Sequence, residues 1–310
     1  MPVSSEKFLI TIVGPTAIGK TALSIQIAQH FNTEIISCDS RQFFKEMSIG
    51  TAVPEPEELN AATHHFIQNR SVFDLYNVGQ FERDALEKLE KLFTKHNVVI
   101  MVGGSGLYID AVLKGLDYFP TVAPEIRENL NQQLIEKGIE YLQEQLKELD
   151  LETYKAIALD NPHRLIRALE ICIGSGLPYS SFKNKPKAPR NFKSLKIGLT
   201  ADREIIYNRI NKRVDIMLEK GFEKEAKKLH PHKKLNALQT VGYRELFSFF
   251  DGEITQEFAI EEIKKNTRRF AKRQLTWFKK DTETIWFDFK TDALEIIREI
   301  RSLGSFKLTK

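Results

Sequence analysis

Residues 8–28 read FLITIVGPTAIGKTALSIQIA and decide the fold of this chain. The apolar run at residues 8–13 predicts a buried strand, and residues 22–28 predict an amphipathic helix. Residues 14–21, between them, match the G-x-x-x-x-G-K-[ST] pattern, which indicates a phosphate-binding loop only between a strand and a helix. A chance glycine-rich turn is the alternative. Because every fixed position is filled and both flanks are correct, the sequence favours the phosphate-binding loop.

Each part of this loop has chemistry that suits a phosphate group. The glycines let backbone N–H groups turn toward phosphate oxygens, and the helix N-terminus adds partial positive charge. Lys20 supplies a point charge, and the hydroxyl of Thr21 can ligate Mg²⁺. The pattern indicates a phosphate or diphosphate and does not identify ATP. The predicted diphosphate- or nucleotide-binding residues are Gly14, Pro15, Thr16, Ala17, Ile18, Gly19, Lys20 and Thr21.

The composition is that of a globular protein with one large domain or one domain plus an insertion. The chain has 310 residues, 42% of them apolar. We expect a cytoplasmic protein without membrane association, since no apolar run approaches a membrane span and no cleavable signal pattern is present. Cys38 and Cys172 are too few for a disulfide framework and are expected to be reduced. Residues 261–280 hold eight Lys or Arg against two Glu, which indicates a polyanionic partner.

A second predicted strand, residues 33–38, leads directly into Asp39. In open α/β sheets, ligands bind beyond the carboxyl ends of the strands, so we expect Asp39 beside the phosphate loop. A carboxylate there can accept a proton from a substrate, ligate Mg²⁺, or hold the water shell of the ion. A helix N-cap is the structural alternative for an Asp at this place.

A third predicted strand, residues 97–102, ends in Gly103, Gly104 and Ser105. It carries no acidic residue at the place where a P-loop ATPase usually has the Asp that holds Mg²⁺. This composition argues against a motor-type ATPase and favours Asp39 as the working carboxylate. The two glycines permit close approach of a ligand, and Ser105 can donate a hydrogen bond to it. A helix-entry turn is the alternative.

The predicted secondary structure changes twice in the middle of the chain. Residues 43–80 predict a long irregular segment, which in a compact domain is usually functional. An amphipathic helix is expected over residues 80–94. Helical patterns then dominate residues 120–190, with expected helices at 124–137, 141–149 and 162–173. We therefore predict a P-loop core in two parts, residues 1–119 and 191–310, with a helical insertion subdomain at 120–190.

The second part of the core alternates again between strand and helix. A strand is expected at residues 195–200 and a helix at 204–220; a loop then leads to a helical region from residue 238. A long basic helix is expected over residues 255–280, and residues 285–287 predict a final strand. In the long helix we expect Phe270 and Trp277 in the core, and four basic residues in contact with phosphates: Arg268, Arg269, Lys272 and Arg273.

Taken together, these motifs resemble the bacterial form of the tRNA dimethylallyltransferase family. The resemblance rests on ten strings in the family's order, which span residues 14–278. No Cys/His pattern like the extra zinc finger of eukaryotic members is present. The strings are GPTAIGKT (14–21), DSRQ (39–42), IGTAVP (49–54), HHFI (64–67), NVGQF (77–81), VGGSGLYI (102–109), HRLIRALE (163–170), DREIIYNRINKRVD (202–215), LQTVGYRE (238–245) and TRRFAKRQLTWF (267–278).

The resemblance implies a prenyltransferase with a P-loop NTPase-like parallel sheet flanked by helices. The reaction it implies moves a dimethylallyl group from dimethylallyl diphosphate to the exocyclic amine of the adenosine just 3′ of a tRNA anticodon. Diphosphate is the leaving group. It also implies a channel, which the diphosphate enters from one mouth and the tRNA base from the other. The base must be flipped out of its stack to be reached.

The resemblance further implies roles for single residues. Lys20, together with Mg²⁺ on Thr21, stabilises the departing diphosphate. Asp39 orients the adenine amine and accepts its proton. Ser105, where most members have Thr, grips the departing phosphate or the nearby tRNA backbone. The implied tRNA contacts are Asp39, Ser40, Arg41, Gln42, Ser105, Arg127, His163, Arg164, Leu165, Ile166 and Arg167, and we add Arg213, Arg268, Arg269, Lys272 and Arg273.

Two further substitutions depart from the family pattern, and two other activities remain open at this point. His163 replaces the more usual Gln, and Ile18 replaces the more usual Ser in the variable part of the loop. A small-molecule P-loop kinase would share the loop, and an adenylate isopentenyltransferase would share the donor and use AMP or ADP. The basic segment at 261–280 favours a tRNA acceptor, in the anticodon stem-loop. We expect the enzyme to act as a monomer.

Overall fold

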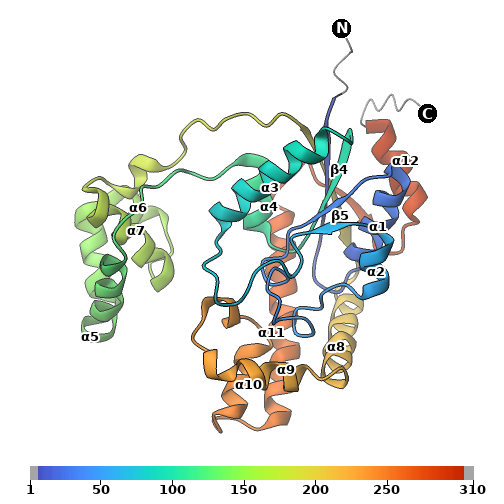
Figure 1. The fold of residues 1–310 in the computed structure, drawn as a ribbon. Coiled ribbons are helices and arrows are strands. Elements are labelled where there is room, and N and C mark those ends of the chain that lie inside the picture. Colours follow the sequence, from blue (N-terminus) through green and yellow to red (C-terminus); the bar gives the residue numbers. More distant parts are fainter. Residues whose placement is uncertain (1–5, 304–310) are drawn as a thin grey trace. The chain divides into compact units, whose positions relative to one another are not determined.

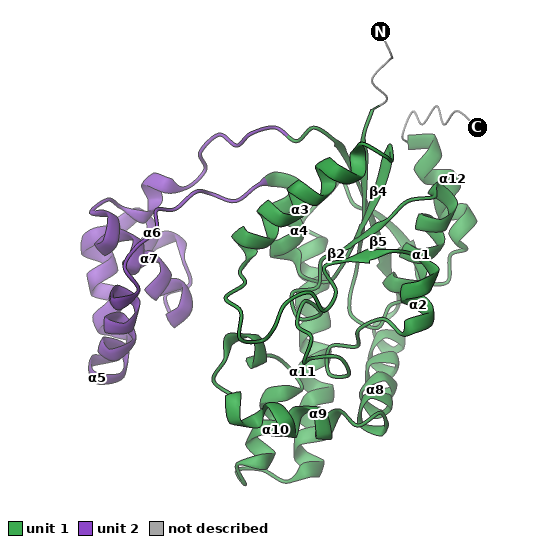
Figure 2. Cartoon of the chain, in the orientation of Figure 1, with its two compact units in different colours: residues 1–114, 190–310 green, residues 115–189 purple. Residues whose placement is uncertain are grey.

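The computed structural model of the chain describes residues 6–303 (Figure 1). It divides into two compact units, coloured separately in Figure 2. The first comprises residues 1–114 and 190–310 and is built from a sheet and helices. The second comprises residues 115–189 and is helical, where the sequence predicted a helical insertion at 120–190.

The first unit contains a six-stranded sheet in which every paired strand is parallel. The strand order is β3-β2-β4-β1-β5-β6, so β1 lies inside the sheet between β4 and β5. This arrangement confirms the predicted parallel α/β fold. The strands are β1 (Phe8–Val13), β2 (Ile35–Ser37), β3 (His64–His65), β4 (Val98–Val102), β5 (Lys193–Thr200) and β6 (Ile285–Asp288).

Helices cover both faces of this sheet, and successive residues of β1 point to opposite faces. Leu9 packs into a core cluster with α3, α4, α9 and α10, whereas Ile10 packs into a second cluster with α1 and α12. Helices α8 and α11 contribute to both clusters. The helices of this unit are α1 (Lys20–Phe31), α2 (Pro56–Ala61), α3 (Val78–Phe93), α4 (Gly106–Lys114), α8 (Arg203–Glu219), α9 (Phe222–Leu229), α10 (Tyr243–Phe250), α11 (Gln256–Phe278) and α12 (Ala293–Leu303), with 3₁₀ turns η2 (His230–His232) and η3 (Asn236–Leu238).

Helix α3 shows how local sequence defines an element here. Asn77 Oδ1 accepts a hydrogen bond from Gln80 N (3.0 Å), and Gln80 Oε1 accepts one from Asn77 N (2.8 Å). This reciprocal pair is a capping box, which satisfies amide groups that the first turn leaves free. The residues expected on the apolar side are the buried ones, namely Phe81, Ala85, Leu89 and Leu92.

Several elements were missed from the sequence. Residues 43–80, expected to be irregular, contain α2 and the two-residue strand β3. The segment before residue 238, expected to be a loop, contains α9. Helix α12 was not predicted either. Two of these helices are too short for a long apolar periodicity: α2 has a capping box but buries no residue, and α9 buries only Phe222, Ala226 and Leu229.

The second unit is a small helical cluster. Helix α5 (Pro124–Leu149) breaks at Gly138, where φ is 82°, so it consists of two segments that match the two predicted helices. Helices α6 (Leu151–Ala156), α7 (Pro162–Ser175) and the 3₁₀ turn η1 (Tyr179–Phe182) complete it. Leu142, Leu146, Leu165 and Leu169 form its core.

Candidate active site

The phosphate loop follows β1 and ends at Thr21, the second residue of α1. Gly14 (φ 142°), Ala17 (φ 63°) and Gly19 (φ 111°) all adopt positive φ, which turns successive backbone N–H groups toward one concavity. A Cβ at Gly14 would lie 2.6 Å from the Leu199 carbonyl oxygen, so only glycine fits there. The N-cap of α1, Gly19, makes no side-chain capping bond, which leaves the first-turn amides available to an anion.

Lys20 lies in a cluster of three charged side chains. Its ammonium Nζ donates to the Pro15 carbonyl oxygen at 2.8 Å within the loop. Burial lowers the pKa of Lys20 from 10.5 to about 8; the charge of Asp39 opposes this shift, and the charge of Arg213 adds to it. Burial also lowers the pKa of Arg213, against the attraction of Asp39. The site therefore holds two cations that an anionic ligand would stabilise.

Asp39 and Ser105 follow β2 and β4, which are neighbours in the sheet. Asp39 Oδ1 accepts a hydrogen bond from Arg41 N at 3.1 Å. The two segments that follow these strands are joined by hydrogen bonds: Ser40 N donates to Ser105 Oγ (3.0 Å), and Ser105 Oγ donates to Ser40 Oγ (3.1 Å). The parallel topology thus brings Lys20, Asp39 and Ser105 to one edge of the sheet, and it places Asp39 beside the phosphate loop, as the sequence predicted.

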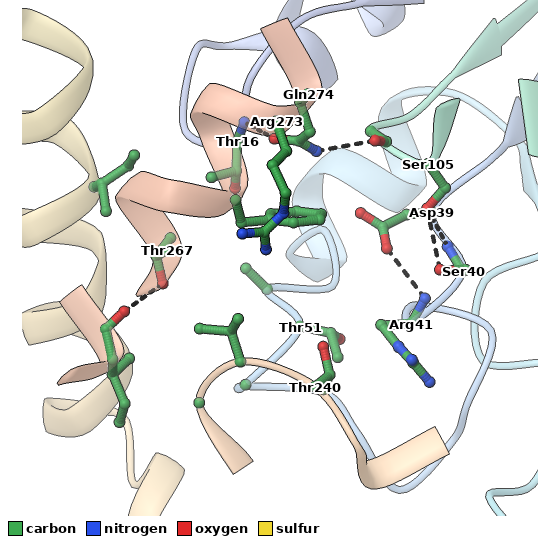
Figure 3. A pocket seen from close by; sticks show the side chains of 18 of the residues that line it. Thr16, Asp39, Ser40, Arg41, Thr51, Ser105, Thr240, Thr267, Arg273 and Gln274 are labelled. Atoms are coloured by element: carbon green, nitrogen blue, oxygen red, sulfur yellow. Dashed lines mark hydrogen bonds between the residues drawn. The ribbon is translucent and has the colours of Figure 1, made fainter. Parts of the chain in front are cut away.

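Two pockets of the first unit meet at this edge. The loop pocket, about 470 Å³, is lined by the phosphate loop, including Lys20 and Thr21, and by α8. The α11 pocket, about 570 Å³, is lined by Ser105, the segment 239–242 and one face of α11 (Figure 3). Four residues line both pockets: Thr16, Asp39, Ala52 and Arg213. Asp39 therefore faces a phosphate-binding space on one side and a second substrate space on the other.

The α11 pocket combines rings with a cation. Phe270 is 38% exposed and Trp277 is 40% exposed, and both line the pocket, so the prediction that they lie in the core is wrong. The side chain of Arg273 reaches into the pocket from α11, opposite Asp39 and Arg41 (Figure 3). Trp277 is oriented by a hydrogen bond from its Nε1 to Asp110 Oδ2 (2.9 Å). Rings and a guanidinium around one space suit a nucleobase with its phosphate.

Several other predicted contact residues bind within the protein. Arg41 donates from one guanidinium nitrogen to the carbonyl oxygens of Asn236 (3.0 Å) and Ala237 (2.9 Å), which ties η3 to the wall of the α11 pocket. Gln42 donates to the carbonyl oxygens of Thr51 (3.1 Å) and Ala52 (2.9 Å) and lines the loop pocket. Both side chains shape the site from the segment that follows Asp39.

The four basic residues of α11 differ in their surroundings. Arg268 donates to Asn211 Oδ1 (2.8 Å) and lies over the ring of Tyr207, so it fastens α11 to α8. Arg273 lies over the ring of Phe270 at the pocket. Arg269 and Lys272 are exposed. Arg273, Arg269 and Lys272 are therefore better placed than Arg268 for contact with an external phosphate.

In the second unit, the predicted contacts fall into two groups. Leu165 and Ile166 have buried side chains in the core of this unit, so neither presents a side chain to a partner. Arg127 and Arg167 both bind the buried carboxylate of Glu170 and keep partly exposed guanidinium groups. These bonds lower the pKa of Glu170, whose burial alone would raise it. His163 and Arg164 are exposed at the start of α7.

Two residues that organise the site were not predicted. Glu225 of α9 accepts hydrogen bonds from the amides of Ser48 (3.0 Å), Ile49 (2.8 Å) and Gly50 (2.9 Å), and one from the Tyr243 hydroxyl (2.6 Å). It thereby fixes the segment that leads to Ala52, which lies between the two pockets. Gln274 of α11 contacts the phosphate loop itself.

The only signal in the sequence for Glu225 and Gln274 was their position within or next to the strings that resemble a known family. Glu225 lies between two such strings, and Gln274 lies within the last one.

Within residues 6–303, no helix is long and apolar enough to span a membrane.

Comparisons with known proteins show the family to which the chain belongs. The sequence model of a family described as IPP transferase matches residues 42–281. The chain is 65% identical to the tRNA dimethylallyltransferase of Christiangramia forsetii and 63% identical to that of Flavobacterium psychrophilum, over 96% and 95% of this chain and 98% of each relative. The crystal structure of the tRNA isopentenylpyrophosphate transferase of Bacillus halodurans is 36% identical, with a TM-score of 0.71 over 97% of this chain and 96% of that one. The chain therefore belongs to the tRNA dimethylallyltransferase family of prenyltransferases.

Proposed function

We propose that the protein transfers the dimethylallyl group of dimethylallyl diphosphate to N6 of the adenosine 3′-adjacent to the anticodon of tRNA. The observation that carries this proposal is the meeting of two pockets at Asp39. One pocket is built for phosphate, and the other is lined by rings and basic groups. A transferase needs its leaving group and its acceptor on opposite sides of the reacting carbon.

The loop pocket suits the diphosphate of the donor. Loop amides, Lys20 and Arg213 are placed to neutralise negative charge that grows as the diphosphate leaves. The Thr21 hydroxyl and the Asp39 carboxylate line the same pocket. Such hard oxygens, completed by phosphate oxygens, are the ligands that Mg²⁺ prefers. When bound, Mg²⁺ supplies additional positive charge at the leaving group.

The α11 pocket suits the acceptor base. The rings of Phe270, Trp277 and Tyr108 offer stacking surfaces for an adenine flipped out of the anticodon loop. Arg273 is placed for the adjoining phosphate. In the second unit, Arg127, Arg164 and Arg167, with His163, are candidates for further contacts with the tRNA backbone.

The chemistry at the junction is a substitution at the allylic carbon. The bond from that carbon to the diphosphate oxygen breaks, and a bond to the adenine N6 forms. N6 then gives up a proton, which Asp39 accepts, and diphosphate departs with its charge balanced by the loop pocket. Since an allylic carbon stabilises positive charge, cleavage can run ahead of bond formation. Ser105, bonded to Ser40 beside Asp39, is placed to bind an oxygen of the departing group or of the tRNA backbone.

An acceptor test distinguishes this reaction from its alternatives. The purified protein is mixed with Mg²⁺ and dimethylallyl diphosphate, and with either an unmodified anticodon stem-loop or AMP. We expect a mass increase of one dimethylallyl group on the RNA and none on AMP. Prenylated AMP would instead indicate a nucleotide-directed isopentenyltransferase, and transfer to neither acceptor, with phosphate transfer from ATP to a metabolite, would indicate a kinase.

The setting of the reaction follows from its substrate. A tRNA acceptor places the enzyme in the cytoplasm, where unmodified tRNA is available. Because a single chain already supplies Lys20, Asp39 and Ser105 at the junction of the two pockets, we propose that a monomer is the active form. Sedimentation of the purified protein tests this directly.

A further inference from the structure

Gln274 is a buried amide in the middle of the basic helix α11. Only 5% of the residue is exposed. Its Oε1 accepts a hydrogen bond from Thr16 N in the phosphate loop (2.9 Å), and its Nε2 donates to the Gly104 carbonyl oxygen (3.0 Å). Figure 3 shows this side chain above the pocket, with Thr16 on one side and the Ser105 segment on the other.

The two partners fix which way the amide points. Thr16 offers only an N–H at this contact and Gly104 only a carbonyl, so exchanging the amide oxygen and nitrogen would break both bonds. The fit at Gly104 is close: a Cβ there would lie 2.2 Å from Gln274 Nε2, and the contacts within 4 Å are to the Gln274 side chain. The glycine thus makes room for this one amide.

The two hydrogen bonds of Gln274 join segments that line the two substrate pockets. Thr16 belongs to the loop that carries Lys20, and Gly104 directly precedes Ser105. Both partners are backbone atoms of the segments that follow β1 and β4, and both segments line the pockets on either side of Asp39. Gln274 therefore fixes the spacing between the phosphate-binding loop and the Ser105 segment.

We propose that Gln274 is a positioning residue for prenyl transfer. It holds the phosphate loop in register with α11, whose neighbouring residues Phe270, Arg273 and Trp277 line the pocket of the acceptor. One helix thereby aligns the diphosphate and the adenine relative to each other. This inference rests on the proposed function, because it needs two substrates to align.

The expected effect is on the rate of transfer more than on substrate binding. Misplacement of reacting groups by about 1 Å can cost about 100-fold in rate. Gln274→Met keeps the length of the side chain and removes both hydrogen bonds. We expect kcat to fall by about 10- to 100-fold, with a smaller change in the KM for dimethylallyl diphosphate. The affinity for inorganic diphosphate, measured by calorimetry without RNA, is expected to stay near that of the wild type.

A double-mutant cycle tests the contact itself. In Gly104→Ala the added Cβ pushes the flexible Gln274 side chain aside, so this variant is expected to slow transfer as Gln274→Ala does. In the double variant the clash has gone, and its rate is expected to match that of Gln274→Ala alone. Thermal unfolding of each variant shows whether the fold is retained.

The outcomes separate three explanations. If the two losses multiply in the double variant, the shared contact is not what matters and the proposal fails. If Gln274→Met lowers only the melting temperature and leaves kcat per folded enzyme unchanged, Gln274 is structural and the proposal also fails. Absence of transfer by the wild-type protein would instead overturn the proposed function, which the same assay measures first.

Discussion

The lowered pKa of Lys20 predicts that binding of the prenyl donor takes up a proton from the solvent. Burial lowers this pKa from 10.5 to about 8, so part of the free protein has a neutral Lys20 amine in mildly alkaline solution. A diphosphate in the loop pocket favours the ammonium form and raises the pKa again. Binding must therefore add a proton to each protein molecule in which Lys20 is neutral.

The size of this uptake follows from the pKa. With a free pKa of about 8 and a protonated Lys20 in the complex, uptake is about 0.1 proton per site at pH 7 and about 0.5 at pH 8, and it rises further above pH 8. The diphosphate itself contributes little there, because the last proton of such a phosphate leaves near pH 6. The donor affinity is accordingly expected to weaken as the pH rises through 8.

The assay is calorimetric titration with dimethylallyl diphosphate and Mg²⁺, without RNA, in two buffers of different ionisation enthalpy. The difference in apparent heat gives the number of protons taken up. Lys20→Arg is the matched control, because arginine keeps the charge and does not lose its proton in this range. Uptake near zero at pH 8.5 in the wild type, or equal uptake in Lys20→Arg, would refute this account of Lys20.

Three further predictions address other parts of the site. Asp39→Asn is expected to lower kcat by about 10²- to 10⁴-fold while anticodon stem-loop binding persists, and joint loss of both would contradict a role as proton acceptor. Arg273→Ala is expected to reduce the slope of log affinity for RNA against log salt by about one. Arg268→Ala removes a contact with α8 and should mainly lower the melting temperature. Equal salt slopes for the two variants would contradict this assignment. Glu225→Gln replaces a carboxylate that binds three amides and a hydroxyl. This change is expected to lower the free energy of unfolding, measured with denaturant, by about 1.5–3 kcal/mol. An unchanged unfolding midpoint would contradict a stabilising role of the Glu225 carboxylate.

The parts of the fold that sequence predicts are those whose pattern is local. A continuous apolar run defined β1, and its junction with α1 carried the phosphate loop. In α3, the residues that recur on the apolar face are the ones that are buried in the structure. Asp39 was correctly placed beside the phosphate loop from the sequence, because parallel strands bring their carboxyl ends to one edge.

The parts that were missed depend on packing between distant segments. Phe270 and Trp277 were assigned to the core because helical periodicity does not distinguish a core from the wall of a pocket. The partners of Gln274 are backbone atoms, which leave no pattern of side chains to detect. Glu225 likewise binds backbone amides, and α9 is only eight residues long, with three buried residues to define its apolar face.

The hydrogen bond between Thr16 and Gln274 spans 258 residues of sequence, which has a consequence for synthesis of the protein. A ribosome adds about 5–20 residues each second, so the phosphate loop emerges roughly 13–50 seconds before the residue that fixes it. During that interval the acceptor pocket lacks the wall that α11 supplies with Phe270, Arg273 and Trp277. The two substrate pockets can therefore be aligned with each other only late in translation, when α11 has been made.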